Sequence, residues 1–267
     1  MALKLHPVAP RQGLLWVHSA LLTFVKHPIA FVGLFMAFLF GVLLLLVVPW
    51  VGGLMGMTLF PMLTLGYMIA TRSALAGGKV NPLQLIDGLR APPASRRRAQ
   101  WLLCLGYALA TVGVIEFAHW VDGGTFEQLQ QAMARGDAQT QVQALLADPR
   151  LLDGMLVRFA LAGMVSVPFW FAPALVHWAH QGLVQSLFTS TLAVWRAKAA
   201  FAVYSLAFAA LLALAALLLG AIGGLLGARQ LAGMLALPLG LVFSAVFYVS
   251  LWFGFADCFG AHQIEET

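Results

Sequence analysis

The sequence predicts an all-α polytopic membrane protein, with six transmembrane helices arranged as three helical hairpin repeats plus interfacial amphipathic helices. Three observations predict this class. Hydrophobic residues make up 61% of the chain and charged residues only 9%, against about 25% charged residues in soluble domains. Six apolar runs have roughly the 20 residues that cross a hydrocarbon core. A Leu-x-Gly-Met-x-x-x-Pro pattern occurs three times.

The six apolar runs give the predicted spans. As helices, with a rise of about 1.5 Å per residue, they are long enough to cross a bilayer. The alternating ten-residue segments typical of membrane barrels do not occur in the sequence. We therefore expect residues 1–267 to form a single transmembrane domain. The runs are Ile29–Val48, Val51–Leu75, Trp101–Ala118, Leu156–Trp178, Ala199–Leu226 and Leu231–Ala256.

The repeated pattern fixes the predicted order of the helices. Its copies are Leu54–Pro61, Leu161–Pro168 and Leu231–Pro238, and each lies in the second run of a pair. Repetition at matched positions indicates repeated structural units, here three hairpins that start from the same side of the membrane. The similarity extends further between the first and third hairpins. Ala30-Phe31, Ala37-Phe38 and Lys26 recur 170 residues later as Ala200-Phe201, Ala207-Phe208 and Arg196.

Two amphipathic segments are predicted to lie at the membrane surface, over residues 11–27 and 182–198. In the first, helical spacing turns apolar residues toward one side, with Trp16 and basic residues at both ends, as in interfacial helices. We expect residues 1–10 to be a loose tail. The apolar side of the first segment comprises Leu14, Val17, Leu21, Phe24 and Val25, and that of the second Leu183, Leu187, Phe188, Leu192 and Trp195.

The long hydrophilic segment, residues 121–152, is predicted to form a small helical cap in the periplasm. Thr125-Phe-Glu-Gln128 has the spacing of a capping box. Gly136-Asp137 should end the first helix of the cap, and a second short helix should run to Ala147.

The basic residues predict the orientation. With both termini in the cytoplasm, eleven of the fifteen lie inside and only Arg135, Arg150, Arg158 and Arg229 lie outside, as the positive-inside rule requires. This placement, rather than nucleic-acid binding, explains the net charge of +5. We expect a bacterial inner-membrane protein that binds no nucleic acid. The eleven are Lys4, Arg11, Lys26, Arg72, Lys79, Arg90, Arg96, Arg97, Arg98, Arg196 and Lys198.

The prolines of the return helices have two interpretations. Pro61, Pro168 and Pro238 belong to the repeated pattern, and Pro173 follows Pro168 by five residues. Each proline frees a backbone carbonyl and bends its helix, and neighbouring helices must then satisfy the freed groups. These residues are either packing devices or the lining of a cavity or substrate path.

Glu116 and Arg158 lie near the outer ends of the third and fourth spans. An ionisable residue in a span is a candidate functional residue. We expect a structural Glu116–Arg158 ion pair, with a proton or substrate relay as the alternative. At the inner side, Arg72 and Asp257 both end spans and could pair.

His177, His180, Cys104 and Cys258 are all placed near the inner ends of spans. Together they could bind zinc or a soft metal. Their spacing matches no metal motif, so we expect interfacial histidines, reduced thiols and no metal. The sequence shows no nucleophile elbow, P-loop or dinucleotide fingerprint. We therefore expect no catalytic residues, no cofactor and no enzyme activity.

Two stretches carry a family resemblance. LLWVHSALLTFVKHPIAFVGL with VVPWVGGLMG, and VPFWFAPALVHWAHQGLVQSLFTSTLAVWRAKAAFAVYSLAF, resemble a family of betaproteobacterial multi-pass inner-membrane proteins. In that family a Trp-bearing surface helix, here with Trp16, precedes the first span, and an F-A-P-A-L-V stretch, here Phe171–Val176, marks the fourth. The chain is more distantly similar to the membrane domain of glycerophosphodiester phosphodiesterases, without a catalytic domain. The resemblance implies a fold and a membrane, and no activity.

These observations favour a non-enzymatic scaffold or accessory subunit. Its expected partners are membrane lipid and either another membrane protein or further copies of this chain in a homo-oligomer. The alternative is a transporter or lipid-handling protein with a path lined by the proline-bent helices. The first rests on the absence of charged residues forced to the middle of the membrane, which ion transport generally requires. A cavity bounded by the prolines would favour the second.

Overall fold

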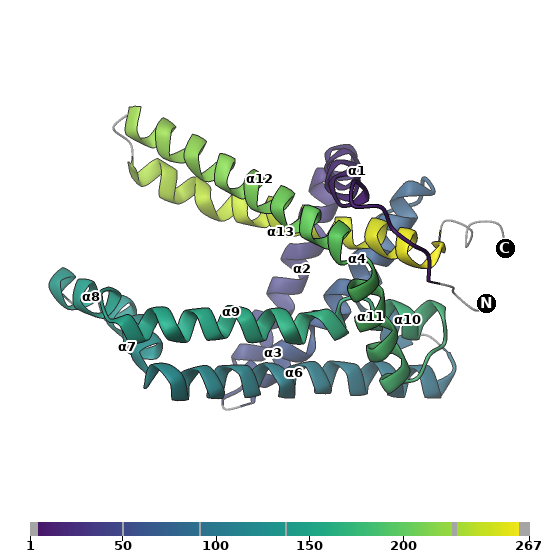
Figure 1. Cartoon of the computed structure of the whole chain (residues 1–267), viewed down its shortest axis with the longest axis horizontal. Coiled ribbons are helices and arrows are strands. Elements are labelled where there is room, and N and C mark those ends of the chain that lie inside the picture. The colour runs from purple at the N-terminus through teal and green to yellow at the C-terminus, as the bar shows by residue number, and fades with distance from the viewer. Residues whose placement is uncertain (1–4, 50, 91, 137, 226–228, 262–267) are drawn as a thin grey trace.

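The fold is described from a computed structural model (Figure 1) covering residues 5–49, 51–90, 92–136, 138–225 and 229–261. These residues form helices and no strand. Six helical stretches among them are long and apolar enough to cross a membrane, which confirms the predicted all-α polytopic class. The stretches are Pro28–Leu46, Gly52–Leu75, Ala94–Asp122, Pro149–Trp178, Lys198–Gly224 and Met234–Phe259.

The spanning helices pair into three hairpins in chain order, each an outgoing helix followed by a return segment. The return segments of the first two hairpins are interrupted. The first hairpin is α2 (Pro28–Leu46) with α3 (Gly52–Thr58) and α4 (Phe60–Leu75), the second is α6 (Ala94–Asp122) with α9 (Pro149–Phe169) and α10 (Ala172–Trp178), and the third is α12 (Lys198–Leu225) with α13 (Arg229–Phe259).

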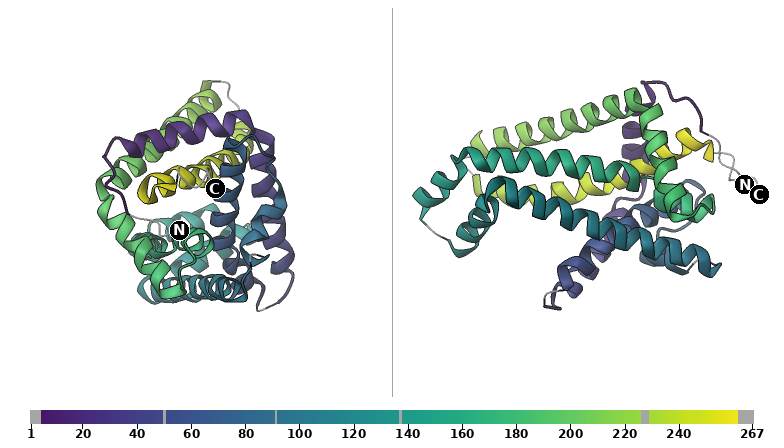
Figure 2. Two further views of the ribbon diagram at one scale, coloured as in Figure 1. Left: turned by 90° about the vertical axis from the view of Figure 1, so that its right-hand side faces the viewer. Right: turned by 60° about the horizontal axis from the view of Figure 1, so that its bottom comes forward.

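All three hairpins start from one end of the molecule, which we call the base. The base also holds α1 (Gln12–Lys26), α11 (Leu183–Arg196) and the two termini (Figure 1). From the base the hairpins diverge toward separate far ends, the tips (Figure 2). Two short helices, η1 (Pro82–Ile86) and α5 (Asp87–Arg90), lead from α4 to α6. The common direction of the hairpins agrees with a parallel repeat.

The duplication between the first and third hairpins holds at the level of helix boundaries. α1 ends at Lys26 and α11 at Arg196, and α2 begins at Pro28 as α12 begins at Lys198, each pair 170 residues apart. The matched phenylalanines are buried in both copies, and they are Phe31 and Phe38 in the first, Phe201 and Phe208 in the second.

Helix α1 differs from its prediction in the face that it buries. Trp16 is only 2% exposed and packs edge-on against Phe201, while Leu14 and Val25 of the predicted apolar side are exposed. The Trp16 indole N–H donates to Asp257 Oδ2 at 2.7 Å. Trp16 is therefore a core residue rather than a membrane-surface anchor. Helix α11 matches the surface prediction better, since Phe188 and Trp195 are exposed.

The prediction of a loose N-terminal tail is also wrong for residues 5–10, the part of the tail that the structure describes. The His6 backbone N–H donates to the Cys258 carbonyl at the end of α13, at 2.9 Å. Leu5 and Val8 pack against the buried core. These contacts tie the beginning of the described chain to its end. Residues 1–4 lie outside the described residues.

The segment 121–152 contains two helices at the tip of the second hairpin, α7 (Thr125–Arg135) and α8 (Gln139–Leu146). The predicted capping box is wrong, because Thr125 is already the first helical residue and its hydroxyl donates to the Asp122 carbonyl at 2.8 Å. Gly123 and Gly124, with φ of 60° and 83°, reverse the chain there, in a conformation that favours glycine. Gly136 ends α7 as predicted, and Asp137 lies outside the described residues.

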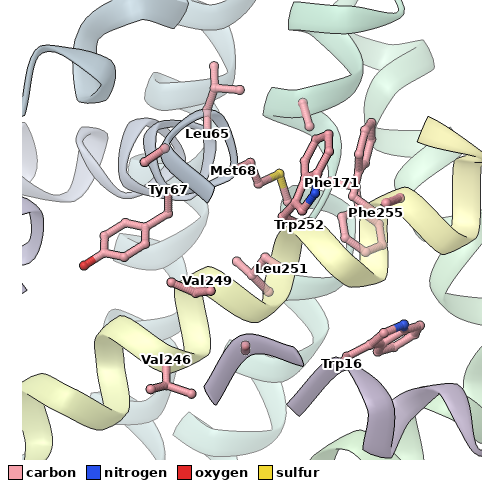
Figure 3. Close-up of a cluster of buried hydrophobic side chains, with 14 of the residues drawn as sticks. Trp16, Leu65, Tyr67, Met68, Phe171, Val246, Val249, Leu251, Trp252 and Phe255 are labelled. Carbon is pink, nitrogen blue, oxygen red and sulfur yellow. The ribbon is translucent and has the colours of Figure 1, made fainter. Parts of the chain in front are cut away.

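The core lies at the base, around the last part of α13. Side chains of α1, α4 and the α9–α10 junction converge on it, as Figure 3 shows for Trp16, Met68, Phe171 and Trp252. Rings in this cluster contact one another edge-on or tilted, for example Phe171 and Phe255 with centroids 5.8 Å apart. Such pairs add to the stabilisation from burial. The tips, in contrast, expose most of their apolar side chains.

Gly13 allows α1 to approach α12, and its substitution tests that contact. A Cβ at Gly13 would lie 2.1 Å from the Ala200 carbonyl oxygen, whereas a Cβ at Gly33 would meet nothing within 4 Å. We expect Gly13→Ala to lower the free energy of unfolding by about 1–3 kcal/mol. Gly33→Ala should leave it unchanged or raise it by up to about 1 kcal/mol. Reversible unfolding in mixed detergent micelles, followed by circular dichroism, measures both. Equal effects of the two substitutions would contradict the close packing of α1 on α12.

Candidate functional site

The return segment of the first hairpin is interrupted just before its repeated proline. Helix α3 ends at Thr58 and α4 begins at Phe60, with Pro61 in its first turn. Proline has no backbone N–H to donate and its ring excludes the regular helical path before it. Pro61 is buried, so the interruption lies inside the molecule.

The return segment of the second hairpin is interrupted just after its repeated proline. Helix α9 ends at Phe169, one residue past Pro168, and α10 begins at Ala172, followed by Pro173. Ser190 of α11 bridges the break, because its Oγ accepts from the Phe171 N–H at 3.1 Å and donates to the Val167 carbonyl at 3.0 Å. Ser190 of a neighbouring helix thus takes over two backbone groups of the interruption. The expectation that neighbouring helices satisfy the carbonyls freed by the prolines themselves stays a prediction.

The third copy of the pattern does not interrupt its helix. Helix α13 runs unbroken through Pro238, which is exposed. The repeated prolines also differ in depth, since Pro168, Pro61 and Pro238 precede the ends of α10, α4 and α13 by ten, fourteen and twenty-one residues. The expectation of three equivalent bent return helices is therefore wrong for Pro238. An interruption of α13 on this exposed stretch would leave backbone N–H and C=O groups without hydrogen-bond partners in hydrocarbon, so the helix stays continuous.

An apolar pocket of about 260 Å³ lies where the two interrupted segments face α6 and α13. None of its eleven lining residues is charged, and six of them are aromatic. We call it the break pocket. It is lined by Phe60, Pro61, Thr64, Tyr107, Gly163, Ser166, Phe169, Trp170, Phe247, Tyr248 and Leu251.

Aromatic contacts frame the break pocket from two sides. On one side Tyr107 lies between Phe60 and Phe169, with ring centroids 6.0 Å and 5.3 Å away. On the other side Phe247 contacts Trp170 and Tyr248, at 6.1 Å and 5.4 Å. Rings held against one another in this way keep the pocket open, since they cannot collapse into it without losing these contacts.

The polar atoms of the pocket offer little chemistry. The Thr64 hydroxyl donates to the Phe60 carbonyl of its own helix, and the Ser166 hydroxyl donates to the Ala162 carbonyl. No imidazole or carboxylate stands beside them in the lining to act as a base. The arrangement can therefore bind an apolar group but supplies no activated nucleophile.

Among the candidate residues from the sequence, only Pro61 lines the break pocket. Pro168 and Pro173 flank the lining residues Phe169 and Trp170 in the chain. Pro238, Glu116, Arg158 and His177 are not in the lining. The sequence offered a signal for Gly163, the glycine of the second repeat copy, but none for the two lining tyrosines.

The predicted Glu116–Arg158 pair is wrong. Glu116 is exposed, while Arg158 bonds to Asp122 and donates to Glu127 Oε1 at 2.9 Å. The glycine reversal after α6 brings Glu127 of α7 beside Asp122, which explains the change of partner. Gly154 makes room for Asp122, since a Cβ there would lie 2.5 Å from the Asp122 Cβ. Arg158 thus ties the cap to the second hairpin.

His119, Asp122 and Glu127 place potential metal-ligand atoms within 4.8 Å of one another. Arg158 already binds both carboxylates, so a cation would compete with a guanidinium for them, and we assign the cluster a structural role. Within the described residues this is the one group of three such side chains. The alternative set of His177, His180, Cys104 and Cys258 is therefore not brought together. The Arg72–Asp257 pair stays a prediction.

Ser190 offers a direct test of how the broken helix is stabilised. Ser190→Ala leaves the buried Phe171 N–H without this acceptor and removes one donor from the partly buried Val167 carbonyl, and leaving a buried group unsatisfied costs about 1–3 kcal/mol. We expect a drop of that order in the free energy of unfolding, measured in mixed micelles by tryptophan fluorescence. Thr191→Ala is the matched control, since Thr191 is exposed and donates only to the Leu187 carbonyl of its own helix. A drop no larger than that of the control would refute the bridging role.

Comparisons with known proteins agree with the architecture. No family model and no solved structure matches the chain. The chain is similar to a probable inner membrane protein of Burkholderia thailandensis, with 32% identity over 265 residues that cover 98% of this chain and 96% of the relative. The likeness to glycerophosphodiester phosphodiesterases finds no support in these comparisons. At this identity and coverage, and with six apolar helices of its own, the chain belongs to the same family of multi-pass inner membrane proteins as this relative.

Proposed function

We propose that this inner-membrane protein is a non-enzymatic lipid-handling protein that holds part of an acyl chain in the break pocket. The observation that carries the proposal is the uncharged, aromatic-lined cavity at two helix interruptions. Its volume of about 260 Å³ lies just below the usual range for ligand sites, roughly 300–1,000 Å³. That size suits a segment of a chain rather than a whole lipid.

Access to the pocket from the bilayer supports this function. Helix α12 is the least buried of the six spans, because only 11% of the residues in its most apolar stretch are buried. The α12–α13 hairpin diverges from the α6–α9 hairpin toward the tips (Figure 1). Gly163 and Ser166 of α9 and Phe247 and Tyr248 of α13 line the pocket near the point where these hairpins converge. In this proposal, a lipid that lies between the two arms places its chain in the break pocket.

The two interrupted helices also support the lipid-handling function. In membrane proteins, irregular backbone at depth is tolerated only where it is buried in protein or lines a cavity. Pro61 and Trp170, one at each break, both line this cavity.

The scaffold role is the second candidate function. Three leucines of the α12–α13 hairpin, Leu206, Leu217 and Leu237, are exposed and would suit a membrane-protein partner or a second copy of the chain.

Filling the break pocket tests the proposal. A Cβ at Gly163 meets nothing within 4 Å although Gly163 lines the pocket, so Gly163→Leu adds a side chain to the cavity without a clash at its Cβ. If the side chain displaces two methylenes of a bound chain, at about 0.8 kcal/mol each, lipid binding weakens about tenfold. The measurement is photo-crosslinking to a phospholipid with a diazirine in its acyl chain, followed by peptide mapping.

The matched control for that experiment is Gly113→Leu. Gly113 is an exposed glycine of α6 whose added Cβ also meets nothing within 4 Å, and it does not line the pocket. Crosslinks to the α9 peptide should persist in this variant. If Gly163→Leu leaves them undiminished, the lipid-handling function is wrong and the scaffold role is preferred.

We also propose that the base faces the cytoplasm, with both termini inside. The support is the distribution of charge, since most of the basic residues lie at the base, whereas Asp122, Glu127 and Asp148 lie at the tip of the second hairpin. Ser95 at the base and Gln130 of α7 are both exposed, and the native Cys104 and Cys258 are buried. In intact cells, an impermeant maleimide should label Gln130→Cys but not Ser95→Cys. The reverse pattern would invert the orientation.

A further inference from the structure

A second apolar depression lies on the outside of the molecule, between α1 and α12. Helix α1 crosses the start of α12 at the base, where Gly13 comes close to the Ala200 carbonyl. Beyond this crossing, in the direction in which α12 runs toward its tip, the two helices form a groove of about 660 Å³, which we call the α1–α12 groove. Its lining includes Leu14, Leu15 and His18 of α1 and Ala207, Ala210 and Leu214 of α12.

The α1–α12 groove is apolar and open to the bilayer. Of its nine lining residues only His18 is polar, and Leu14, Ala210 and Leu214 are exposed. Its volume lies within the usual range for ligand sites, roughly 300–1,000 Å³, and from Ala207 to Leu214 it follows α12 for about 10 Å. Since α12 is long and apolar enough to span the membrane, the apolar groups beside this stretch are lipid acyl chains.

Arg11 and His18 lie on the same face of α1 as the groove leucines. The N–H groups of Leu14 and Leu15 donate to the Arg11 carbonyl at 3.2 Å and 3.3 Å, so Arg11 precedes them by one helical turn, and His18 follows them by one turn. Residues at this spacing are neighbours on a helix surface. Both side chains are exposed, and neither forms an ion pair or a side-chain hydrogen bond within the described part of the chain.

The acidic residue that contacts α1 does so on another side of the helix. Asp257 of α13 accepts from Gln12 Nε2 at 3.0 Å and from the Trp16 indole, and neither Gln12 nor Trp16 lines the groove. The groove therefore combines an apolar channel along α12 with a guanidinium and an imidazole at its base end.

We propose that the α1–α12 groove binds an anionic phospholipid, with an acyl chain along residues 207–214 and the phosphate at Arg11 and His18. A guanidinium matches phosphate oxygens in geometry and charge, and an imidazole has an N–H to donate in either tautomer. The order of the groups fits, since a phospholipid joins a headgroup at the membrane surface to a chain that runs inward. The groove shares no lining residue with the break pocket, so this proposal stands whether or not that pocket holds a lipid.

Filling the groove tests the place of the acyl chain. The probe is phosphatidylglycerol with a diazirine in its acyl chain, photo-crosslinked to the full-length protein in detergent and mapped to the peptides of α1 and α12. If Ala210→Leu displaces two methylenes of the chain, crosslinking at subsaturating probe should fall about tenfold. The matched control is Ala209→Leu, since Ala209 is the exposed neighbour that does not line the groove. Gly163→Leu, which fills the break pocket, should leave these crosslinks unchanged.

Removing the guanidinium tests the place of the phosphate. Short-chain phosphatidylglycerol and phosphatidylcholine are titrated with native mass spectrometry as the readout, and the unsubstituted protein should prefer phosphatidylglycerol. We expect Arg11→Gln to weaken phosphatidylglycerol binding about tenfold, because a charge-assisted hydrogen bond is lost, and to abolish the preference. The matched control is Lys26→Gln, at the other end of α1, exposed and outside the groove, which should change binding less than about twofold.

All four substituted residues are exposed, and thermal unfolding followed by circular dichroism checks that each variant keeps the fold. Equal losses in Arg11→Gln and Lys26→Gln, or equal affinity of the unsubstituted protein for the two lipids, would show only diffuse surface attraction and overturn the proposal. Crosslinks that Ala210→Leu and Ala209→Leu diminish equally would also overturn it. So would the absence of lipid crosslinks on α1 and α12, the result expected if another protein or a second copy of the chain covers the groove.

Discussion

In hydrocarbon, a backbone N–H or C=O without a partner costs several kcal/mol, so a spanning helix can be interrupted only where another group takes over its hydrogen bonds. Ser190 does this for the second hairpin, by accepting from the Phe171 N–H and donating to the Val167 carbonyl. Because α11 places this hydroxyl against the junction, α9 and α10 can part. The parting turns Phe169 and Trp170 toward the break pocket. A small polar side chain on a surface helix thus makes the interior cavity possible.

The second constraint is that the three hairpins share a core only at the base. Helix α13 passes through that core, where α1, α4 and α10 surround it, and its first half extends with α12 into the unpacked arm. Lipid tails are as apolar as leucine, so nothing pulls the arms together in a bilayer except close packing or hydrogen bonds. The arms are therefore free to diverge toward the tips. The polar cluster at the tip of the second hairpin stabilises only the cap and that hairpin.

Features that depend on local pattern could be predicted from the sequence. The six spans follow from apolar length, and the matched ends of α1 and α11, at Lys26 and Arg196, follow from the internal duplication. The buried face of α1 could not be predicted in the same way, because in a membrane protein both the lipid-facing and the protein-facing sides are apolar. Periodicity therefore grouped Leu14 with Phe24, although only Phe24 is buried. The partner of Arg158 depended on a glycine reversal that no periodicity reveals.

The break pocket could not be predicted from the sequence, for a related reason. Its lining comes from four separate helices, and only Pro61 and Gly163 belong to the repeated pattern. The pattern is the same in α13, but Pro238 lies on an exposed stretch and the helix continues. Whether a proline interrupts a helix depends on what surrounds it. The sequence shows the proline but not its surroundings.

The hydrogen bond between His6 and Cys258 has a consequence for how the protein is made. Residues near the N-terminus are bound to the end of the last helix, and Trp16 donates to Asp257 from the same helix. Synthesis delivers the N-terminal segments first, so α1 leaves the ribosome long before its binding surface exists. The first two hairpins must be inserted and must wait in the bilayer without it. Assembly of the base is then the final event of biogenesis, and a chain that stops before α13 lacks part of the surface on which α1 docks.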